Sequence, residues 1–270
     1  MKTRILVAAV GLPLLLLVVL VLPSIATALL VAAMSVLAVY ELLIGAGFCK
    51  HVRIFAYSSM MAVAVSIWSW YGMPRTFGAV CVLVYLCALF CEMLAAHTEL
   101  KLRTVCAAIF AALILPYLLG ALIRLRIMGL GKYYVLTVFL LTMIPDSGAY
   151  FAGRLFGKRK LCPVISPNKT IEGAIGGTVC TILFMLLYAL ILQFGFKLRV
   201  NYVFAVIYGV LGALGSILGD LTFSVIKRQA KIKDYGTLLP GHGGILDRFD
   251  STMVVAPLVE VLVLLIPFAV

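Results

Sequence analysis

Acidic and basic side chains gather in one short stretch of this chain, residues 224–250. Three aspartates lie there among five basic residues: Asp234, Asp247, Asp250, Lys227, Arg228, Lys231, Lys233 and Arg248. A turn from Pro240 to Gly244 lies between them. Carboxylates suit hard cations such as Mg²⁺, while basic side chains and the N–H groups of a turn bind phosphate oxygens. These residue types predict a site for a multiply anionic ligand held together with a cation.

A plain cytosolic loop, which is often basic in membrane proteins, is the alternative interpretation. It accounts for the lysines and arginines. It does not account for three aspartates among them, or for four glycines between Gly236 and Gly244. We therefore interpret the stretch as part of a site that binds a ligand.

Six of the ten acidic residues lie in or beside the expected cytosolic halves of the last four apolar segments: Asp146, Glu172, Asp220, Asp234, Asp247 and Asp250. A carboxylate at the centre of a membrane helix costs about 2.5 to 3.5 kcal/mol, so it normally faces a cavity and meets a cation or a donor. For Asp146 and Asp234, pairing with a buried Lys or Arg is an equal alternative. For Asp220 and Asp247 we favour a role in ligand binding.

Helical spacing places Asp220 on a polar face that descends from the cytosolic surface. The residues of that face are Ser216, Asp220, Ser224 and Lys227. A neighbouring stripe consists of Gly212, Gly215 and Gly219. Because small residues let membrane helices approach closely, this stripe could bring Asp220 near other carboxylates.

Other polar positions have local alternatives. Asp247, Asp250 and Ser251 could share one face where the last helix should begin, although Asp250 could also cap that helix. Pro145 is expected to kink or loosen the helix beside Asp146. Of the three histidines, His242 is the one placed for ligand contact. The glycines at 173, 176 and 177 fit helix packing better than a nucleotide-binding turn, and a P-loop sequence is absent.

Composition defines the class of the protein. Hydrophobic residues make up 64% of the 270 residues and charged residues 12%, with a mean hydropathy of +1.19. Such a chain cannot bury its apolar surface in one soluble core, so we expect an all-α integral membrane protein with a polar cleft that faces the cytosol. About nine segments are long enough to span a bilayer. They are residues 5–22, 24–47, 54–72, 77–95, 104–123, 133–152, 171–195, 202–226 and 252–270.

This pattern divides the chain into an N-terminal region, residues 1–100 with about four helices, and a C-terminal region, residues 101–270 with about five, which contains the candidate site. The cytosolic loops of the second region are residues 153–170 and 227–250. Most of the 22 basic residues fall on the N-terminal side of the membrane. The positive-inside rule therefore predicts a cytosolic N-terminus and site, and a C-terminus outside. The first helix is expected to stay uncleaved, and the seven cysteines are interpreted as small core residues.

The charged stretch resembles a known family. Ser224 to Arg228, then Lys233-Asp234, then Pro240 to Asp250 are similar to the signature of phosphatidate cytidylyltransferases, also called CDP-diacylglycerol synthases. Residues 146–150 resemble the same family, with Ser147 where Thr is often found, and so do residues 166–173. The resemblance covers about residues 100 to 270, whereas the first hundred residues match only as hydrophobic spans, so no role is carried over to them.

The resemblance implies transfer of a cytidylyl group from CTP to phosphatidic acid, which gives CDP-diacylglycerol and pyrophosphate for phospholipid biosynthesis. It implies Mg²⁺, with room for a second cation, and a multi-pass enzyme of the bacterial inner membrane. No nucleic acid is expected as a partner. The many glycines are compatible with a homodimer.

The resemblance also implies roles for single residues. Asp220 and Asp247 would be the principal cation ligands, with Asp250 and Asp146 supporting them. The basic residues that would hold phosphates and the departing pyrophosphate are Lys227, Arg228, Lys233 and Arg248. The residues that would contact substrate from turns and loops are Ser166, Lys169, Thr170, Ser224, Gly241, His242, Gly243 and Gly244.

Two other functions stay open at this point. A CTP-dependent kinase of polyprenols would need the same cations and basic loop. An ion-coupled transporter would use Asp146 and Asp220 as ion ligands near the midplane, although these acids lie toward one face and no inverted repeat is visible.

Overall fold

The computed structural model describes residue 11 and residues 13–72, 74–236 and 243–270. The chain forms two compact units. Unit 1 contains Met1–Ile127 and Gln229–Phe249, and unit 2 contains Met128–Arg228 and Asp250–Val270. Neither unit is a single stretch of sequence, because the charged segment after residue 228 belongs with the N-terminal helices. Each unit is described by itself below.

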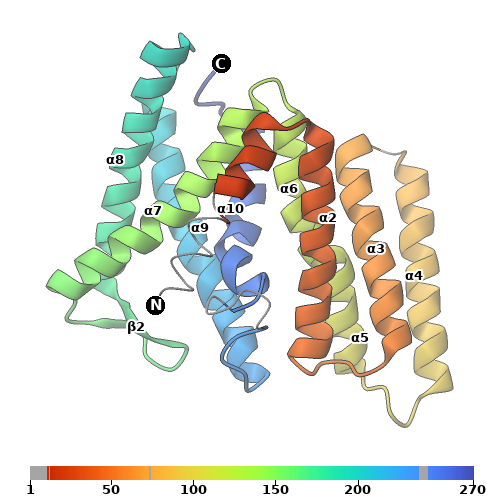
Figure 1. Cartoon of the computed structure of the whole chain (residues 1–270). Helices are drawn as coiled ribbons and strands as arrows, with labels where there is room; N and C mark the ends of the chain where they lie inside the picture. The colour runs from red at the N-terminus through yellow and green to blue at the C-terminus, as the bar shows by residue number, and fades with distance from the viewer. Residues whose placement is uncertain (1–10, 12, 73, 237–242) are drawn as a thin grey trace. The chain divides into compact units, whose positions relative to one another are not determined.

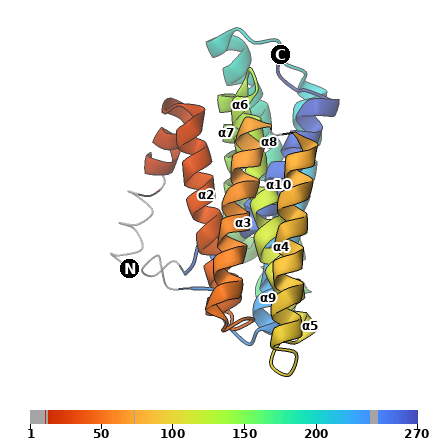
Figure 2. The same ribbon diagram turned by 90° about the vertical axis from the view of Figure 1, so that its right-hand side faces the viewer.

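Unit 1 is a bundle of long apolar helices (Figures 1 and 2). In chain order its elements are η1 (Leu17–Val21), α2 (Ser24–Tyr40), η2 (Glu41–Gly45), α3 (Val52–Tyr71), α4 (Arg75–Ala95), α5 (Leu102–Ile109), η3 (Phe110–Ile114) and α6 (Leu115–Ile127). The segments labelled η are single π-helical turns: η2 continues α2, and η3 joins α5 to α6. α2 packs against α3 and α6, and α4 lies on the far side of α3.

The ends of these helices follow from local sequence. α2 and α4 begin directly after Pro23 and Pro74, whose rings fix φ and whose missing N–H groups no helix needs at that position. α3 ends at Gly72, which adopts a left-handed conformation with φ of 63°. Glycine takes this conformation without steric cost, so it is a common helix terminator.

Unit 2 contains four helices and a hairpin: α7 (Gly131–Phe156), β1 (Lys160–Cys162), β2 (Ser166–Thr170), α8 (Ile171–Phe196), α9 (Tyr202–Gln229) and α10 (Leu246–Leu265). The boundary between the units falls inside α10, after Phe249. β1 and β2 pair antiparallel, with Lys160 opposite Thr170. At the other end of α8, Phe268 packs against the rings of Tyr134, Tyr188 and Tyr208 to form an aromatic core.

α7 crosses α8 obliquely at close range through small residues (Figure 1). A Cβ atom added at Gly177 would lie 2.6 Å from the carbonyl oxygen of Pro145, and one added at Gly148 would lie 2.9 Å from the Cβ of Cys180. These distances confirm that the glycines at the start of α8 serve helix packing. Pro145 lies inside α7 and does not end it.

Within the part of the chain that the structure describes, seven helical segments are long and apolar enough to cross a membrane. They are Ser24–Gly45, Val52–Tyr71, Arg75–Ala95, Leu102–Ile127, Gly131–Phe156, Ile171–Phe196 and Tyr202–Gln229. They correspond to the second to eighth predicted spans. Residues 5–10 and 12 of the first predicted span lie outside the described residues, and its described part is short, with η1 at Leu17–Val21. The ninth predicted span corresponds to α10. This helix is not among the seven because it carries too many charged residues, which are Asp247, Arg248, Asp250 and Glu260.

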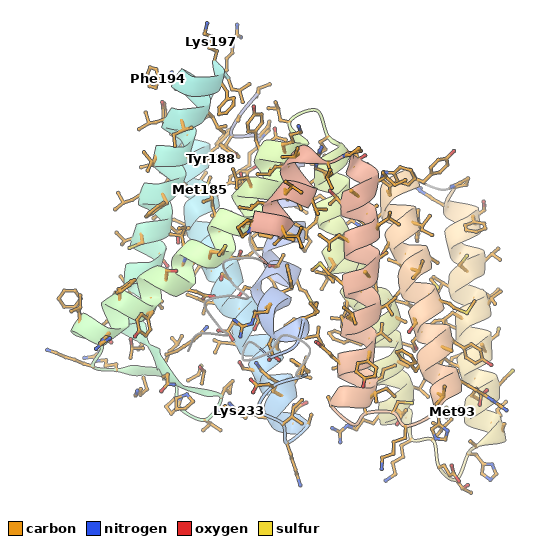
Figure 3. All side chains as sticks on the ribbon, viewed as in Figure 1. Met93, Met185, Tyr188, Phe194, Lys197 and Lys233 are labelled. Carbon is orange, nitrogen blue, oxygen red and sulfur yellow. The ribbon has the colours of Figure 1, made fainter. Side chains whose placement is uncertain are left out.

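The outer surfaces of the helices are apolar, as expected for contact with lipid. On α8, Phe194 is 75% exposed whereas Met185 is 1% exposed, and Figure 3 shows the two side chains on different sides of the helix. α4 carries Cys87 and Cys91 on its exposed surface, and Cys106 is exposed on α5. The prediction that the cysteines are core residues is therefore wrong for these three, because a helix in lipid can point a small apolar side chain outward.

The prediction of an exclusively helical chain missed the β1–β2 hairpin. Its strands are short, and Pro167 and Asn168 are poor strand formers. What holds the hairpin is a set of contacts around it. Glu172 accepts hydrogen bonds from the backbone N–H groups of Lys158 (3.0 Å) and Arg159 (3.1 Å), and the N–H of Ile171 donates to the carbonyl of Arg159 at 2.9 Å.

Candidate functional site

Asp220 lies on a polar stripe of α9, as helical spacing predicts. The hydroxyl of Ser224, one turn later, donates to Oδ1 of Asp220 at 3.2 Å. One turn earlier, the carbonyl of Ser216 accepts a hydrogen bond of 3.1 Å from the hydroxyl of Ser251 in α10. The stripe therefore orients Asp220 on one side and joins α9 to the start of α10 on the other.

Gly219 explains how α9 and α10 approach so closely at this point. A Cβ atom at Gly219 would lie 2.8 Å from the carbonyl oxygen of Asp250 and 2.8 Å from the Cα of Ser251. The absence of a side chain at position 219 thus lets the backbone at Asp250 lie against α9 beside Asp220. This confirms the prediction that the glycine stripe brings a second carboxylate near Asp220.

The charges of this region influence one another. Asp250 is 9% exposed, and its Oδ1 accepts the N–H of Ser251 at 2.7 Å. Burial, and next the negative charge of Asp220, raise the pKa of Asp250 to about 7, and Asp146 adds to the increase while Lys227 opposes it. Three carboxylates that repel one another would be relieved by a cation.

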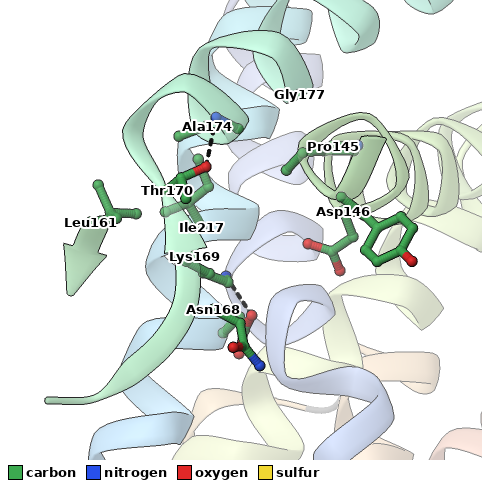
Figure 4. A pocket seen from close by; sticks show the side chains of 13 residues that line it. Pro145, Asp146, Leu161, Asn168, Lys169, Thr170, Ala174, Gly177 and Ile217 are labelled. Atoms are coloured by element: carbon green, nitrogen blue, oxygen red, sulfur yellow. Dashed lines mark hydrogen bonds and ion pairs between the residues drawn. The ribbon is translucent and has the colours of Figure 1, made fainter. Parts of the chain in front are cut away.

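Lys169 brings one positive charge to these carboxylates. Its Nζ forms an ion pair with Oδ2 of Asp220, from β2 to α9 (Figure 4). The turn of the hairpin is also fixed to α9, because Nε of Arg228 donates to the carbonyl of Ile165 at 3.4 Å. At the end of β2, the hydroxyl of Thr170 accepts the N–H of Gly173 at 3.1 Å and caps α8.

A cavity of about 270 Å³ opens between α7, the hairpin, the start of α8 and α9. Asp146 and Tyr150 line it from α7, Lys169 and Thr170 from β2, and Asp220 from α9. Figure 4 shows the carboxylate of Asp146 facing this space from the side opposite Lys169. The cavity is open enough to admit a polar group among these charges, and its other lining residues are mainly apolar.

The oxygen donors in unit 2 fit a hard divalent cation. Asp220, Asp250 and Asp146 supply carboxylates, and Mg²⁺ typically takes one or two carboxylates and completes its shell with water and substrate phosphates. The described residues hold no group of three or more His, Cys, Asp or Glu side chains close enough to bind one ion.

The loop after α9 belongs to unit 1 and has its own organisation. Oδ2 of Asp247 accepts the N–H of Tyr235 at 2.8 Å and that of Gly244 at 3.0 Å, so this side chain closes the loop on itself. Gly243 adopts a positive φ of 85°, and a Cβ atom there would lie 2.8 Å from Oδ2 of Asp247. The N–H of Gly244 was predicted to face phosphate, but in this conformation it is bound to Asp247.

The remaining predicted residues lie as follows. Lys233 and Arg248 are exposed in unit 1, and Ser166, Lys227 and Arg228 lie in unit 2. Gly241 and His242, with Pro240, fall outside the described residues. Asp220, Asp146, Asp250, Lys169 and Thr170 are brought together within unit 2.

Comparison with known proteins assigns the chain to a family. A model of the cytidylyltransferase family matches residues 2–266. The chain belongs to the cytidylyltransferase family. The match includes the residues of unit 1 that precede the signature-like segments.

Named relatives of this cytidylyltransferase-family chain occur in staphylococci. Phosphatidate cytidylyltransferases of Staphylococcus saprophyticus and Staphylococcus haemolyticus are each 46% identical to it over 134 residues. That of Staphylococcus epidermidis is 48% identical over 134 residues. In each case the alignment covers 50% of this chain and 50% of the relative, so the chain spans about half the length of the curated relatives it matches.

Sequence reasoning missed one polar residue of this cytidylyltransferase-family chain, Glu41. Its carboxylate is 2% exposed and accepts the N–H groups of Ile245 and Leu246, each at 2.8 Å. These contacts cap the start of α10, so the suggested cap role of Asp250 is wrong: Asp250 lies a full turn inside the helix. Glu41 could have been noticed as an ionisable residue inside an apolar span, which by default is a functional candidate.

Proposed function

We propose that this membrane protein transfers a cytidylyl group from CTP to phosphatidic acid and forms CDP-diacylglycerol and pyrophosphate. The proposal is supported by membership of the cytidylyltransferase family over nearly the whole chain and by the names of its relatives. The observation that carries it in this chain is the grouping of Asp220, Asp146 and Lys169 around one cavity of unit 2, with Asp250 near enough for the charges of both aspartates to act on it.

The reaction needs no general base from the protein. A phosphomonoester has a second pKa of about 6, so the phosphate of phosphatidic acid is mostly dianionic at neutral pH and can attack the α-phosphorus of CTP directly. The bond between the α-phosphorus and the bridging oxygen then breaks, and pyrophosphate leaves. The difficulty is electrostatic, because a dianion must approach a triphosphate of about four negative charges.

Basic side chains of this chain would lower that repulsion. Lys169 lines the cavity, and Arg228 is held at the turn of the hairpin by the carbonyl of Ile165. Both would bind phosphate oxygens and the departing pyrophosphate. Lys227 would add positive charge from the end of α9 in unit 2. Within unit 1, Lys233 and Arg248 would offer positive charge to a phosphate from the loop and the first turn of α10. In-line attack would depend on how these groups hold the two phosphates.

A divalent cation, Mg²⁺ on the chemistry of its ligands, would be held in unit 2 by Asp220 and Asp250, with Asp146 as a further carboxylate. When bound, it would neutralise phosphate charge and polarise the α-phosphate. The position of Lys169 on Asp220 keeps that carboxylate paired when no ligand is present, and Ser224 keeps it oriented.

The lipid substrate suits the apolar surroundings. A headgroup could reach the cavity while its acyl chains stay against the exposed apolar surfaces of α7 and α8. The distribution of the basic residues supports a site at the inner leaflet of the cell membrane, where CTP is available, with the C-terminus outside. The glycine-rich helices would permit a homodimer.

The test is an assay with CTP that carries its label in the α-phosphate. We expect the purified protein to move that label into lipid only when phosphatidic acid is present, with one pyrophosphate released for each lipid formed. CTP labelled in the γ-phosphate should leave no label in lipid. The reverse pattern would instead identify a kinase, and ion movement into proteoliposomes without consumption of CTP would identify a transporter.

A further inference from the structure

Glu41 lies far from the charged stretch in sequence and contacts it directly within unit 1. Oε1 accepts the N–H of Ile245 and Oε2 accepts the N–H of Leu246, each at 2.8 Å. A buried carboxylate is costly unless donors satisfy both oxygens, and here two consecutive backbone groups do so. The arrangement fixes the backbone just before α10 from a point on η2.

Glycines on both sides let this backbone come close to Glu41. A Cβ atom at Gly236 would lie 3.0 Å from Oε1 of Glu41, and the Cβ position at Gly244 is also filled by the carboxylate. On η2 itself, a Cβ atom at Gly45 would lie 2.6 Å from the carbonyl oxygen of Tyr235. The loop therefore touches η2 at both of its ends, at residues 235–236 and at residues 244–246.

Two carboxylates, that of Asp247 and that of Glu41 on η2, accept hydrogen bonds from the backbone N–H groups of the loop. Asp247 takes the N–H groups of Tyr235 and Gly244, and Glu41 takes those of the next two residues, Ile245 and Leu246. Three consecutive N–H groups, from Gly244 to Leu246, are thus held by carboxylates. These contacts fix the backbone that leads into α10 and so fix the position of Asp247, the next residue.

We propose that Glu41 is a positioning residue of the catalytic loop: its carboxylate holds residues 244–246 so that Asp247 and the first turn of α10 are presented in a fixed conformation. The expected effect of Glu41 on turnover rests on the proposed function. Glu41 would act through the loop and not touch CTP or lipid. It would give the N-terminal helices, for which the sequence suggested no role, an indirect part in the reaction.

Hydrogen exchange separates this idea from the proposed function, because it needs no turnover. In the purified protein we compare Glu41→Gln, in which an amide NH₂ replaces one acceptor, with the matched control Glu99→Gln at an exposed glutamate. We expect the amides of Ile245 and Leu246 to exchange at least about tenfold faster in Glu41→Gln, with α3 unchanged. The value of kcat/KM for CTP should fall about tenfold or more, and Glu99→Gln should behave as wild type.

Gly236→Ala provides a second route to the same contact, because its methyl group would press on Oε1 of Glu41. It should accelerate exchange at Ile245 in the same way, and it decides the matter if Glu41→Gln is not recovered folded. Wild-type exchange at residues 245 and 246 would overturn the proposal, as would faster exchange with unchanged turnover. Faster exchange spread evenly over α2 and α3 would also overturn it. If the wild-type protein shows no turnover at all, the proposed function fails while the exchange result still decides the role of Glu41.

Discussion

Nζ of Lys169 and Oδ2 of Asp220 form an ion pair between the β1–β2 hairpin and α9, and each side chain is 24% exposed. The pair joins a residue proposed to bind phosphate to one proposed to bind a cation. Before substrate arrives, each would neutralise the other. Arrival of a cation and a triphosphate would offer both a new partner of opposite charge.

The first prediction concerns this lysine. Lys169→Gln removes the positive charge next to the cavity, so we expect kcat/KM for CTP to fall by about tenfold or more, the value of a charged hydrogen bond to phosphate. Lys160→Gln is the matched control, since Lys160 lies in the partner strand and is exposed. It should change kcat/KM less than about twofold. Equal losses in the two variants would show that the hairpin contributes only general positive charge.

The second prediction concerns the carboxylates. Asp220→Asn keeps the shape of the side chain and an acceptor for Ser224 but loses its charge, so we expect turnover to fall by about a hundredfold or more at unchanged membrane expression. Turnover of Asp247→Asn should fall by a similar factor. Besides the loss of charge, this substitution weakens the acceptor that binds the N–H groups of Tyr235 and Gly244. Glu99→Gln serves again as the control. Turnover close to wild type in Asp220→Asn would remove Asp220 from the proposed cation ligands. The same result in Asp247→Asn would contradict the cation role that the family resemblance implies for Asp247.

The third prediction tests the close approach of α9 and α10. The methyl group of Gly219→Ala would meet the backbone of Asp250 and Ser251, which cannot move aside as a side chain can. We expect a loss of about 1 to 3 kcal/mol in stability and a larger proportional loss of turnover, measured by thermal unfolding and by the labelled-CTP assay. The control is Gly195→Ala on α8, where the nearest atom to an added Cβ would be 4.0 Å away. A tolerated alanine at 219 would mean that the separation of Asp220 and Asp250 is not critical.

The fourth prediction separates two roles of Thr170. Its hydroxyl caps α8 by accepting the N–H of Gly173, so Thr170→Ala should cost about 1 kcal/mol of stability. Thr170→Ser keeps the hydroxyl and should retain the cap. If Thr170 only caps the helix, turnover of the alanine variant should return to near wild type when the assay temperature is lowered. A persistent loss would indicate contact with substrate.

The fifth prediction concerns the cation. Removal of divalent ions with a chelator should abolish transfer of label from CTP, and added Mg²⁺ should restore it, because the carboxylates of unit 2 would otherwise repel the phosphates. The helical content, measured by circular dichroism, should stay the same throughout, since the helices are held by apolar packing. Full turnover in the presence of the chelator would contradict a role for a divalent ion. Adding K⁺ to the Mg²⁺-restored enzyme tests for a second cation.

The helices and one part of the site could be predicted from sequence for physical reasons. Apolar length alone locates a membrane helix, so the second to eighth spans were found with small errors at their ends. Helical periodicity is equally local, and it placed Ser224 beside Asp220 and Gly219 toward a neighbouring helix. These inferences needed no knowledge of distant parts of the chain.

The features that were missed depend on distant contacts. The hairpin exists because Glu172 and Arg228 hold backbone groups around it, which strand propensity does not report. The cap of α10 comes from a residue more than two hundred positions earlier, so the local choice of Asp250 was wrong. The ion pair between Lys169 and Asp220 likewise required the relative positions of β2 and α9. The number of charged residues indicated the type of site, but it did not show which side chains form ion pairs.

The contact between Glu41 and the start of α10 also bears on how far this enzyme could be shortened. A fragment that begins near residue 100 would retain every segment that resembles the family signature, so it would look like a minimal version of the protein. Its amides at Ile245 and Leu246 would nevertheless lose their acceptors. Supplying residues 1–100 as a separate polypeptide would then be the way to ask whether the two pieces can complement each other.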